Sequence, residues 1–264
     1  MSFIQVDKVV HYYTVEGADG APVLVFANSL GSDHRIWDPV LPFLREKFRI
    51  IRYDQRGHGL SDVTPSPYSI DELVSDLAGL LEGLKIDDAV VCGLSVGGMI
   101  AQGLSASHPD RVRALVLCDT AMQIGPPSMW EERIAVIQKG GIGVLTEPIM
   151  ERWLTLAFRE TRVTEFRGYL NMLERTPVEG YIGTCCAIRD ADLRKSAASI
   201  DRPTLVLCGD QDMATPPELA EKLADAIPGA KLSLIDDAAH ISCVEQPEIF
   251  SQLLHNFVEG IRNA

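Results

Sequence analysis

Basic residues are scarce in this sequence of 264 residues. It has 24 lysines and arginines against 37 aspartates and glutamates, which gives a formal net charge of −13. A surface this acidic repels phosphate backbones and anionic lipids, so we expect neither nucleic acid nor a membrane as a partner. The charge does not exclude a small anionic substrate, because a few arginines inside a pocket can reverse the local field.

Long apolar runs and paired cysteines are missing as well. No stretch reaches the roughly 18 apolar residues that a membrane span needs, and the first residues, MSFIQVD, combine no basic segment with an apolar run. None of the six cysteines shows CxxC spacing, which argues against a zinc site and against a disulfide framework. We therefore expect a cytoplasmic protein whose cysteines are small buried hydrophobes.

Short apolar runs alternate with helical patterns along the chain, which is typical of a parallel sheet flanked by helices. The predicted strands cover residues 23–27, 49–53, 89–92, 112–117, 204–207 and 231–235, with residues 9–15 as an additional edge strand. Ser69 and Glu72 form a capping box before one helix, and the last helix is predicted to begin at Pro247. The pattern predicts the α/β class with a mostly parallel central sheet.

One region interrupts this alternation. Residues 122–200 contain no strand pattern but several amphipathic segments, which include Trp130 and Trp153. We predict that this segment is a helical lid, inserted into a core domain formed by residues 1–121 and 201–264.

The most informative motif is GLSVG at residues 93–97, which follows a predicted strand and precedes a helix-forming run. In this context the pattern G-x-S-x-G holds a serine in a strained turn at the N-terminus of a helix. The helix dipole and the free N–H groups there favour developing negative charge. The motif therefore predicts Ser95 as a nucleophile.

A serine nucleophile needs a base, and in this arrangement the acid and then the histidine follow the serine along the chain. Asp210 and Asp212 both follow the strand 204–207, and the spacing G-x-x-D before a proline-containing turn favours Asp212. His240 follows the last predicted strand and is the predicted general base, whereas His58 lies in what we interpret as a structural turn.

An oxyanion hole requires two backbone N–H groups that point at the developing negative charge. One is expected from Val96, directly after the nucleophile. The other is expected from Leu30, in the loop after the strand 23–27.

Taken together, these features resemble the α/β-hydrolase family over nearly the whole chain. Asn28-Ser29 stands where that family usually has His-Gly, and the segments NSLGSD at 28–33 and GLSVGGMIAQ at 93–102 resemble the 3-oxoadipate enol-lactonases. Further similar segments are ERW at 151–153, GY at 180–181, AIRDAD at 187–192 and AHIS at 239–242.

The resemblance implies a carboxylic ester hydrolase of the β-ketoadipate pathway of aromatic catabolism. It would open 3-oxoadipate enol-lactone with water to give 3-oxoadipate, without a metal or an organic cofactor. Its partner would be a small anionic lactone, whose carboxylate needs a cationic or hydrogen-bonding group. Predicted pocket residues are Trp130, Arg133 and Trp153, and the other candidate cations of the lid are Arg152, Arg189 and Arg194.

Other functions stay open at this point. A general carboxylesterase, a haloperoxidase-like hydrolase and a carbon–carbon bond hydrolase of the same fold would share the three catalytic groups. A ligand-binding receptor with slow hydrolysis would share them too. The sequence also leaves the oligomeric state open, a homo-oligomer included.

Overall fold

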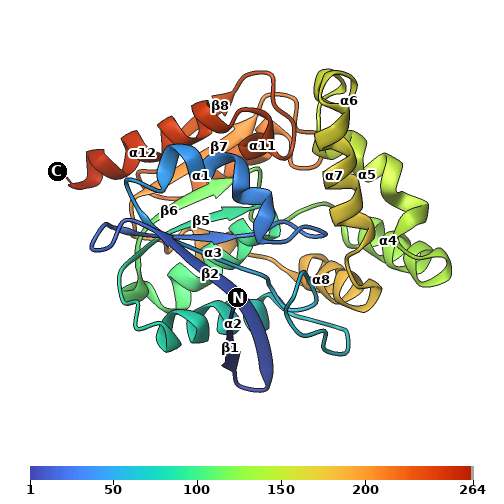
Figure 1. Cartoon of the computed structure of the whole chain (residues 1–264), viewed down its shortest axis with the longest axis horizontal. Helices are drawn as coiled ribbons and strands as arrows, with labels where there is room; N and C mark the ends of the chain where they lie inside the picture. The colour runs from blue at the N-terminus through green and yellow to red at the C-terminus, as the bar shows by residue number, and fades with distance from the viewer. Residues whose placement is uncertain (263–264) are drawn as a thin grey trace.

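The computed structural model describes residues 1–262 and contains one eight-stranded sheet in the order β1-β2-β4-β3-β5-β6-β7-β8 (Figure 1). In chain order the strands are Ser2–Val6, Val9–Gly17, Val23–Ala27, Arg49–Tyr53, Ala89–Leu94, Val112–Cys118, Thr204–Gly209 and Lys231–Ile235. The pairs β1–β2 and β2–β4 are antiparallel, and all other neighbours are parallel. The predicted α/β class with a mostly parallel sheet is confirmed.

The central strands carry continuous apolar runs because helices cover both faces of the sheet. Every residue of β5 and β7 is buried, and so is every residue of β6 except Arg113. In Figure 1, α2 (Ile70–Gly83) and α3 (Val96–Ser107) lie below the sheet, while α1 (Leu41–Leu44) and α12 (Pro247–Arg262) lie above it. The predicted capping box is present at the start of α2, and α12 begins at Pro247 as expected.

The prediction of an edge strand at residues 9–15 is wrong in its placement. These residues do form a strand, β2, but it lies between β4 and β1. The strand at the edge of the sheet is β1, which pairs with β2. A two-residue turn, in which Asp7 has φ 51°, reverses the chain between the two strands. The sequence did not indicate β1 because only Val6 of its five residues is buried, so its apolar pattern is weak.

The segment between β6 and β7 contains helices and connecting loops but no strand. It contains α4 (Pro127–Gly140), η3 (Ile142–Leu145), α5 (Thr146–Trp153), α6 (Leu156–Thr161), α7 (Val163–Glu174), α8 (Val178–Asp190) and α9 (Arg194–Ala197). Helices α4 to α8 lie together at one end of the sheet, on the right in Figure 1, whereas α9 packs against α3. The division into a lid at 122–200 and a core at 1–121 and 201–264 stays a prediction.

The remaining short elements complete the layers around the sheet. They are η1 (His34–Val40), η2 (Pro109–Arg111), α10 (Pro217–Ala226) and α11 (Ser242–Glu245). Among residues 1–262, no helix combines the length and the hydropathy that crossing a membrane requires.

Candidate active site

Ser95 lies in the sharp turn that connects β5 to α3. Its backbone has φ 57° and ψ −118°, a conformation that residues with a side chain rarely adopt. The glycines of the motif make this turn sterically feasible: a Cβ on Gly97 would lie 2.1 Å from the carbonyl oxygen of Ala27, and one on Gly93 would lie 2.2 Å from that of Gly97. The motif thus lets the start of α3 touch the end of β3 and presents Ser95 at the N-terminus of the helix.

Asp212 follows β7 and is hydrogen-bonded to His240. The distance between Asp212 Oδ2 and His240 Nδ1 is 2.8 Å. Asp212 Oδ1 accepts hydrogen bonds from the N–H groups of Ala214 and Thr215, and the Thr215 hydroxyl donates to Oδ2. The competing carboxylate, Asp210, is exposed and accepts a hydrogen bond from Ala238 N at 3.3 Å. The structure therefore brings Asp212, and not Asp210, to the histidine.

His240 lies in the loop after β8 and is 3% exposed. Burial by itself lowers the pKa of His240, but the charge and the hydrogen bond of Asp212 outweigh burial, so that the pKa is raised above its usual value. The bond to Asp212 directs the Nδ1 proton to the carboxylate and leaves Nε2 as the basic nitrogen. Such a histidine can take a proton from a hydroxyl.

Ser95 and His240 line the same cavity, which has a volume of about 500 Å³. Within residues 1–262, no hydrogen bond joins the Ser95 hydroxyl to the imidazole. In enzymes such a bond often tightens only when the substrate binds. The predicted nucleophile and base therefore lie in the same cavity. The hydrogen bond between the Ser95 hydroxyl and the imidazole of His240 is expected to form when substrate binds.

Among residues 1–262, two backbone N–H groups near Ser95 have no acceptor: that of Leu30, which lines this cavity, and that of Val96, which directly follows Ser95. Within the described part of the chain, neither Leu30 N nor Val96 N donates a hydrogen bond. The carbonyl oxygen of Ser29 accepts hydrogen bonds from Ser32 N (3.2 Å) and Ser32 Oγ (2.9 Å). Because the C=O and N–H of a trans peptide point in opposite directions, these bonds turn the Leu30 N–H away from Ser32. Both N–H groups are thus available to an oxyanion.

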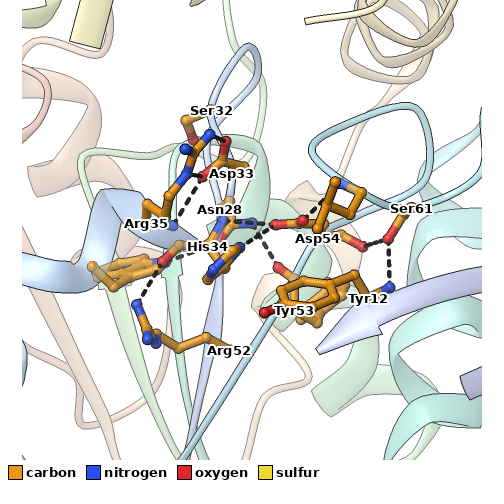
Figure 2. Close-up of polar contacts among 12 residues, drawn as sticks. Tyr12, Asn28, Ser32, Asp33, His34, Arg35, Arg52, Tyr53, Asp54 and Ser61 are labelled. Carbon is orange, nitrogen blue, oxygen red and sulfur yellow. Dashed lines mark hydrogen bonds and ion pairs between the residues drawn. The ribbon is translucent and has the colours of Figure 1, made fainter. Parts of the chain in front are cut away.

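Asn28, at the position where the family usually has histidine, anchors the start of this loop. Figure 2 shows its side chain directed at β4, where Nδ2 donates to the carbonyl oxygen of Tyr53 at 2.7 Å. Trp37 Nε1 donates to Asn28 Oδ1 at 2.8 Å. The asparagine satisfies both of its polar ends inside the protein, so its role is to hold the loop.

All three predicted pocket residues line the cavity, together with Arg152. The guanidinium of Arg133 lies 4.9 Å from the ring centre of Trp130, whose indole N–H already donates to a backbone carbonyl. Within residues 1–262, neither Arg133 nor Arg152 has an acidic partner within 4 Å.

The other two candidate arginines of residues 122–200 form ion pairs outside this cavity. Arg189 pairs with Asp190, and Arg194 pairs with Asp192. Among residues 1–262, Arg133 and Arg152 at the cavity thus lack an acidic partner, and Arg133 donates a hydrogen bond only to the Tyr181 hydroxyl at 3.4 Å, whereas Arg189 and Arg194 are paired with aspartates.

Asp119, directly after β6, is a buried carboxyl that sequence reasoning missed. Its Oδ1 accepts a hydrogen bond from Gly209 N at 2.8 Å, and its Oδ2 accepts one from the Ser242 hydroxyl at 2.6 Å. Burial, and then the nearby charge of Asp212, raise the pKa of Asp119 to about 8. The available signal was an acidic residue at the carboxyl end of a buried strand.

Among residues 1–262, two groups of side chains have the composition of a metal site. The first is Asp33, His34 and Asp54. Figure 2 shows that these acids already contact protein groups: Asp33 pairs with Arg35 at 2.5 Å, and Asp54 lies 2.9 Å from His34 Nδ1. The second group, Asp119, Cys208 and Asp212, includes the two carboxyls described above, whose oxygens also accept protein hydrogen bonds. The expectation that no cofactor is needed stays a prediction.

Comparison with known proteins agrees with this geometry. The family model described as the alpha/beta hydrolase family matches residues 24–253. A 3-oxoadipate enol-lactonase of Acinetobacter baylyi is 34% identical over 93% of this chain and 91% of its own length. The crystal structure of an enol-lactonase from Burkholderia xenovorans superposes with a TM-score of 0.95 at 36% identity, covering 98% of this chain and all of that one.

Another relative carries a different name. A putative carbamate hydrolase of Azorhizobium caulinodans is 29% identical over 93% of this chain and 94% of its own length. The fold, the placement of Ser95, Asp212 and His240, and the family match point in the same direction: this chain is a hydrolase that belongs to the alpha/beta hydrolase family.

Proposed function

We propose that the protein is a serine hydrolase that opens an enol-lactone bearing a carboxylate side chain, with 3-oxoadipate enol-lactone as the expected substrate. The observation that carries this proposal is the cavity, which has Ser95 and His240 in its lining and the unpaired cations Arg133 and Arg152 in the same lining. The similarity to enol-lactonases over nearly the whole chain supports the same substrate class.

In the proposed reaction His240 Nε2 takes the proton of the Ser95 hydroxyl while the oxygen attacks the ring carbonyl. The N–H groups of Leu30 and Val96 stabilise the negative charge on the carbonyl oxygen. The C–O bond of the ring then breaks, and the leaving enolate takes the proton from the His240 imidazolium and becomes a ketone, which returns His240 to its neutral form. Water, deprotonated by His240, finally cleaves the acyl-enzyme and releases the dicarboxylic keto acid.

The free arginines give this site its preference for an anion. A carboxylate that leaves water needs a charged or hydrogen-bonding partner, and Arg133 lies against an aromatic ring in a largely apolar lining. The protein has a net charge of −13, so most of its surface repels anions. Two arginines without acidic partners in one cavity therefore favour an anionic substrate at that place.

The test compares 3-oxoadipate enol-lactone with the neutral enol-lactone α-angelica lactone. Ser95→Ala should abolish turnover of both. Arg133→Gln should raise KM for the anionic lactone about tenfold or more and leave the neutral lactone nearly unchanged, as expected for the loss of one charge-assisted contact.

Arg189→Gln, which removes a paired arginine outside the cavity, is the matched control and should change neither KM. Activity confined to simple esters, or an equal effect of Arg133→Gln on both lactones, would contradict the proposed substrate.

A further inference from the structure

His58 is a buried histidine that the reaction above does not use. It is fully buried in the loop between β4 and α2. Its Nδ1 lies 3.1 Å from the carbonyl oxygen of Arg56, and its Nε2 lies 3.0 Å from the N–H nitrogen of Gly31. A carbonyl oxygen only accepts, so Nδ1 carries the proton, and Nε2 accepts the Gly31 N–H. Only a neutral imidazole can do both, and burial lowers the pKa of His58 to about 4.

Gly31 directly follows Leu30, the residue whose N–H faces the developing charge. The two peptide groups on either side of the Leu30 Cα are each held by a hydrogen bond. Ser32 binds the carbonyl of the Ser29–Leu30 peptide, and His58 binds the N–H of the Leu30–Gly31 peptide. With both planes held, the Leu30 N–H cannot swing without breaking a buried hydrogen bond.

The lid holds the same glycine from the other side. The hydroxyl of Thr176, between α7 and α8, lies 3.2 Å from the carbonyl oxygen of Gly31 and 3.2 Å from that of Met172, and its one hydrogen is shared between these two acceptors. Gly31 has φ +78°, and a Cβ there would lie 2.7 Å from Leu173. The loop is therefore packed so tightly that a small movement of His58 would be transmitted to it.

We propose that His58 is a positioning residue. By accepting the hydrogen bond from Gly31 N–H, it fixes the direction of the N–H of the preceding residue, Leu30. The inference rests on the proposed function only in that it requires acyl transfer at Ser95. It does not depend on which ester or lactone is the substrate.

The test uses two variants that each keep one half of the imidazole's function. His58→Gln places an amide oxygen at the reach of Nε2 and can still accept the Gly31 N–H. His58→Asn places its amide at the reach of Nδ1 and can donate to the Arg56 carbonyl, but it cannot reach Gly31. Both variants remove a similar part of the ring, so a purely structural role predicts similar losses in both.

Activity is measured with p-nitrophenyl acetate, and phenylboronic acid serves as a probe whose boronate on Ser95 mimics the oxyanion. We expect His58→Asn to lower kcat at least about tenfold, since misplacing a catalytic group by about 1 Å can cost up to about a hundredfold. KM should change by less than about threefold, and phenylboronic acid should bind more weakly in proportion to kcat. His58→Gln should stay within about threefold of the wild type for all three quantities.

His11→Asn is the matched control, because His11 is also buried, in β2, and its ring nitrogens contact Asp54 and Asp76 and not Gly31. It should leave kcat nearly unchanged. Equal losses of kcat in His58→Asn and His58→Gln would overturn the proposal, and so would a change confined to KM.

If His58→Asn does not fold by circular dichroism, the comparison moves to His58→Gln and His58→Met, which have the same reach but differ in the acceptor. Equal kcat values in that pair would also overturn the proposal. Because the probe is a simple ester, failure on the enol-lactone would refute the proposed substrate and leave this result standing.

Discussion

At the scale of single residues, two buried carboxyl groups lie behind His240. Asp212 binds the imidazole directly, and oxygens of Asp119 and Asp212 lie within 4.8 Å of each other. Two like charges this close inside a protein are costly, so one carboxyl keeps its proton more readily. Asp119 is the one whose pKa is raised, because it is buried and does not contact the imidazole nitrogen.

This pair predicts a pH dependence of stability. Asp119 has a pKa of about 8 in the folded protein against 3.8 in the unfolded chain, so between these values the folded protein holds a proton that the unfolded chain has released. The free energy of unfolding should therefore fall as the pH rises through this window, by at most about 1.4 kcal/mol per pH unit from this group. Asp119→Asn cannot titrate, and its amide can still bind both Gly209 and Ser242.

Urea unfolding of both proteins between about pH 5 and pH 8 measures the effect, and the difference cancels groups that titrate alike in both. The variant should gain stability relative to the wild type as the pH rises. Parallel pH curves would show that Asp119 does not bind a proton in the folded state.

At the scale of elements, the loop that carries His240 is tied to the helical segment above it. Glu245 in α11 accepts a hydrogen bond from Ala239 N through Oε2, and from both Thr155 N and the Thr155 hydroxyl through Oε1. Next to it, Ile241 N donates to the carbonyl oxygen of Trp153. One buried carboxylate thus joins α11, the His240 loop and the connection between α5 and α6.

Removal of this carboxylate should destabilise the fold. Glu245→Ala leaves two backbone N–H groups without their acceptor, and each unsatisfied buried donor costs about 1–3 kcal/mol. Two such donors together predict a loss of about 2–6 kcal/mol in the free energy of unfolding. Glu245→Gln should lose less, because its amide oxygen can still accept one set of these bonds.

Urea unfolding curves provide the measurement here as well. Glu259→Ala is the control, since Glu259 forms an exposed ion pair with Arg262 on α12 and should cost less than about 0.5 kcal/mol. If Glu245→Ala were no more costly than this surface change, Glu245 would not hold the two loops together.

At the scale of the whole molecule, the interior is held together without covalent links. All six cysteines are free and buried, and they lie in the three strands β5, β6 and β7 and the two helices α8 and α11. Burial raises the pKa of the Cys185 thiol to about 12, so this thiol stays protonated at neutral pH. The expectation that the cysteines are small buried hydrophobes agrees with this arrangement.

The folded protein should therefore be inert to the thiol reagent 5,5′-dithiobis(2-nitrobenzoic acid). We expect no rapidly reacting thiol in the native state and six in concentrated guanidinium chloride. The Tm should be the same with and without a reducing agent. A rapid native reaction, or a Tm that falls on reduction, would contradict the free and buried state of the cysteines.

The sequence by itself determined those structural features that depend on residues close together along the chain. The strands at the centre of the sheet are continuous apolar runs, and the turn at Ser95 is dictated by glycines two residues to each side. The strand β1 escaped prediction because its stability comes from pairing with β2 and not from its own burial. Local pattern was therefore sufficient for the sheet, except at its exposed edge.

Only the tertiary structure decided how distant groups meet. The spacing before the proline-containing turn favoured Asp212 over Asp210, but only the structure shows the contact of Asp212 with His240, 28 residues later. The position of Arg133 in the cavity lining, the raised pKa of Asp119 and the hydrogen bond between His58 and Gly31 likewise depend on residues far along the chain. Hydrogen bonds and charges act over a few ångströms in space, and residue spacing along the sequence does not encode those distances.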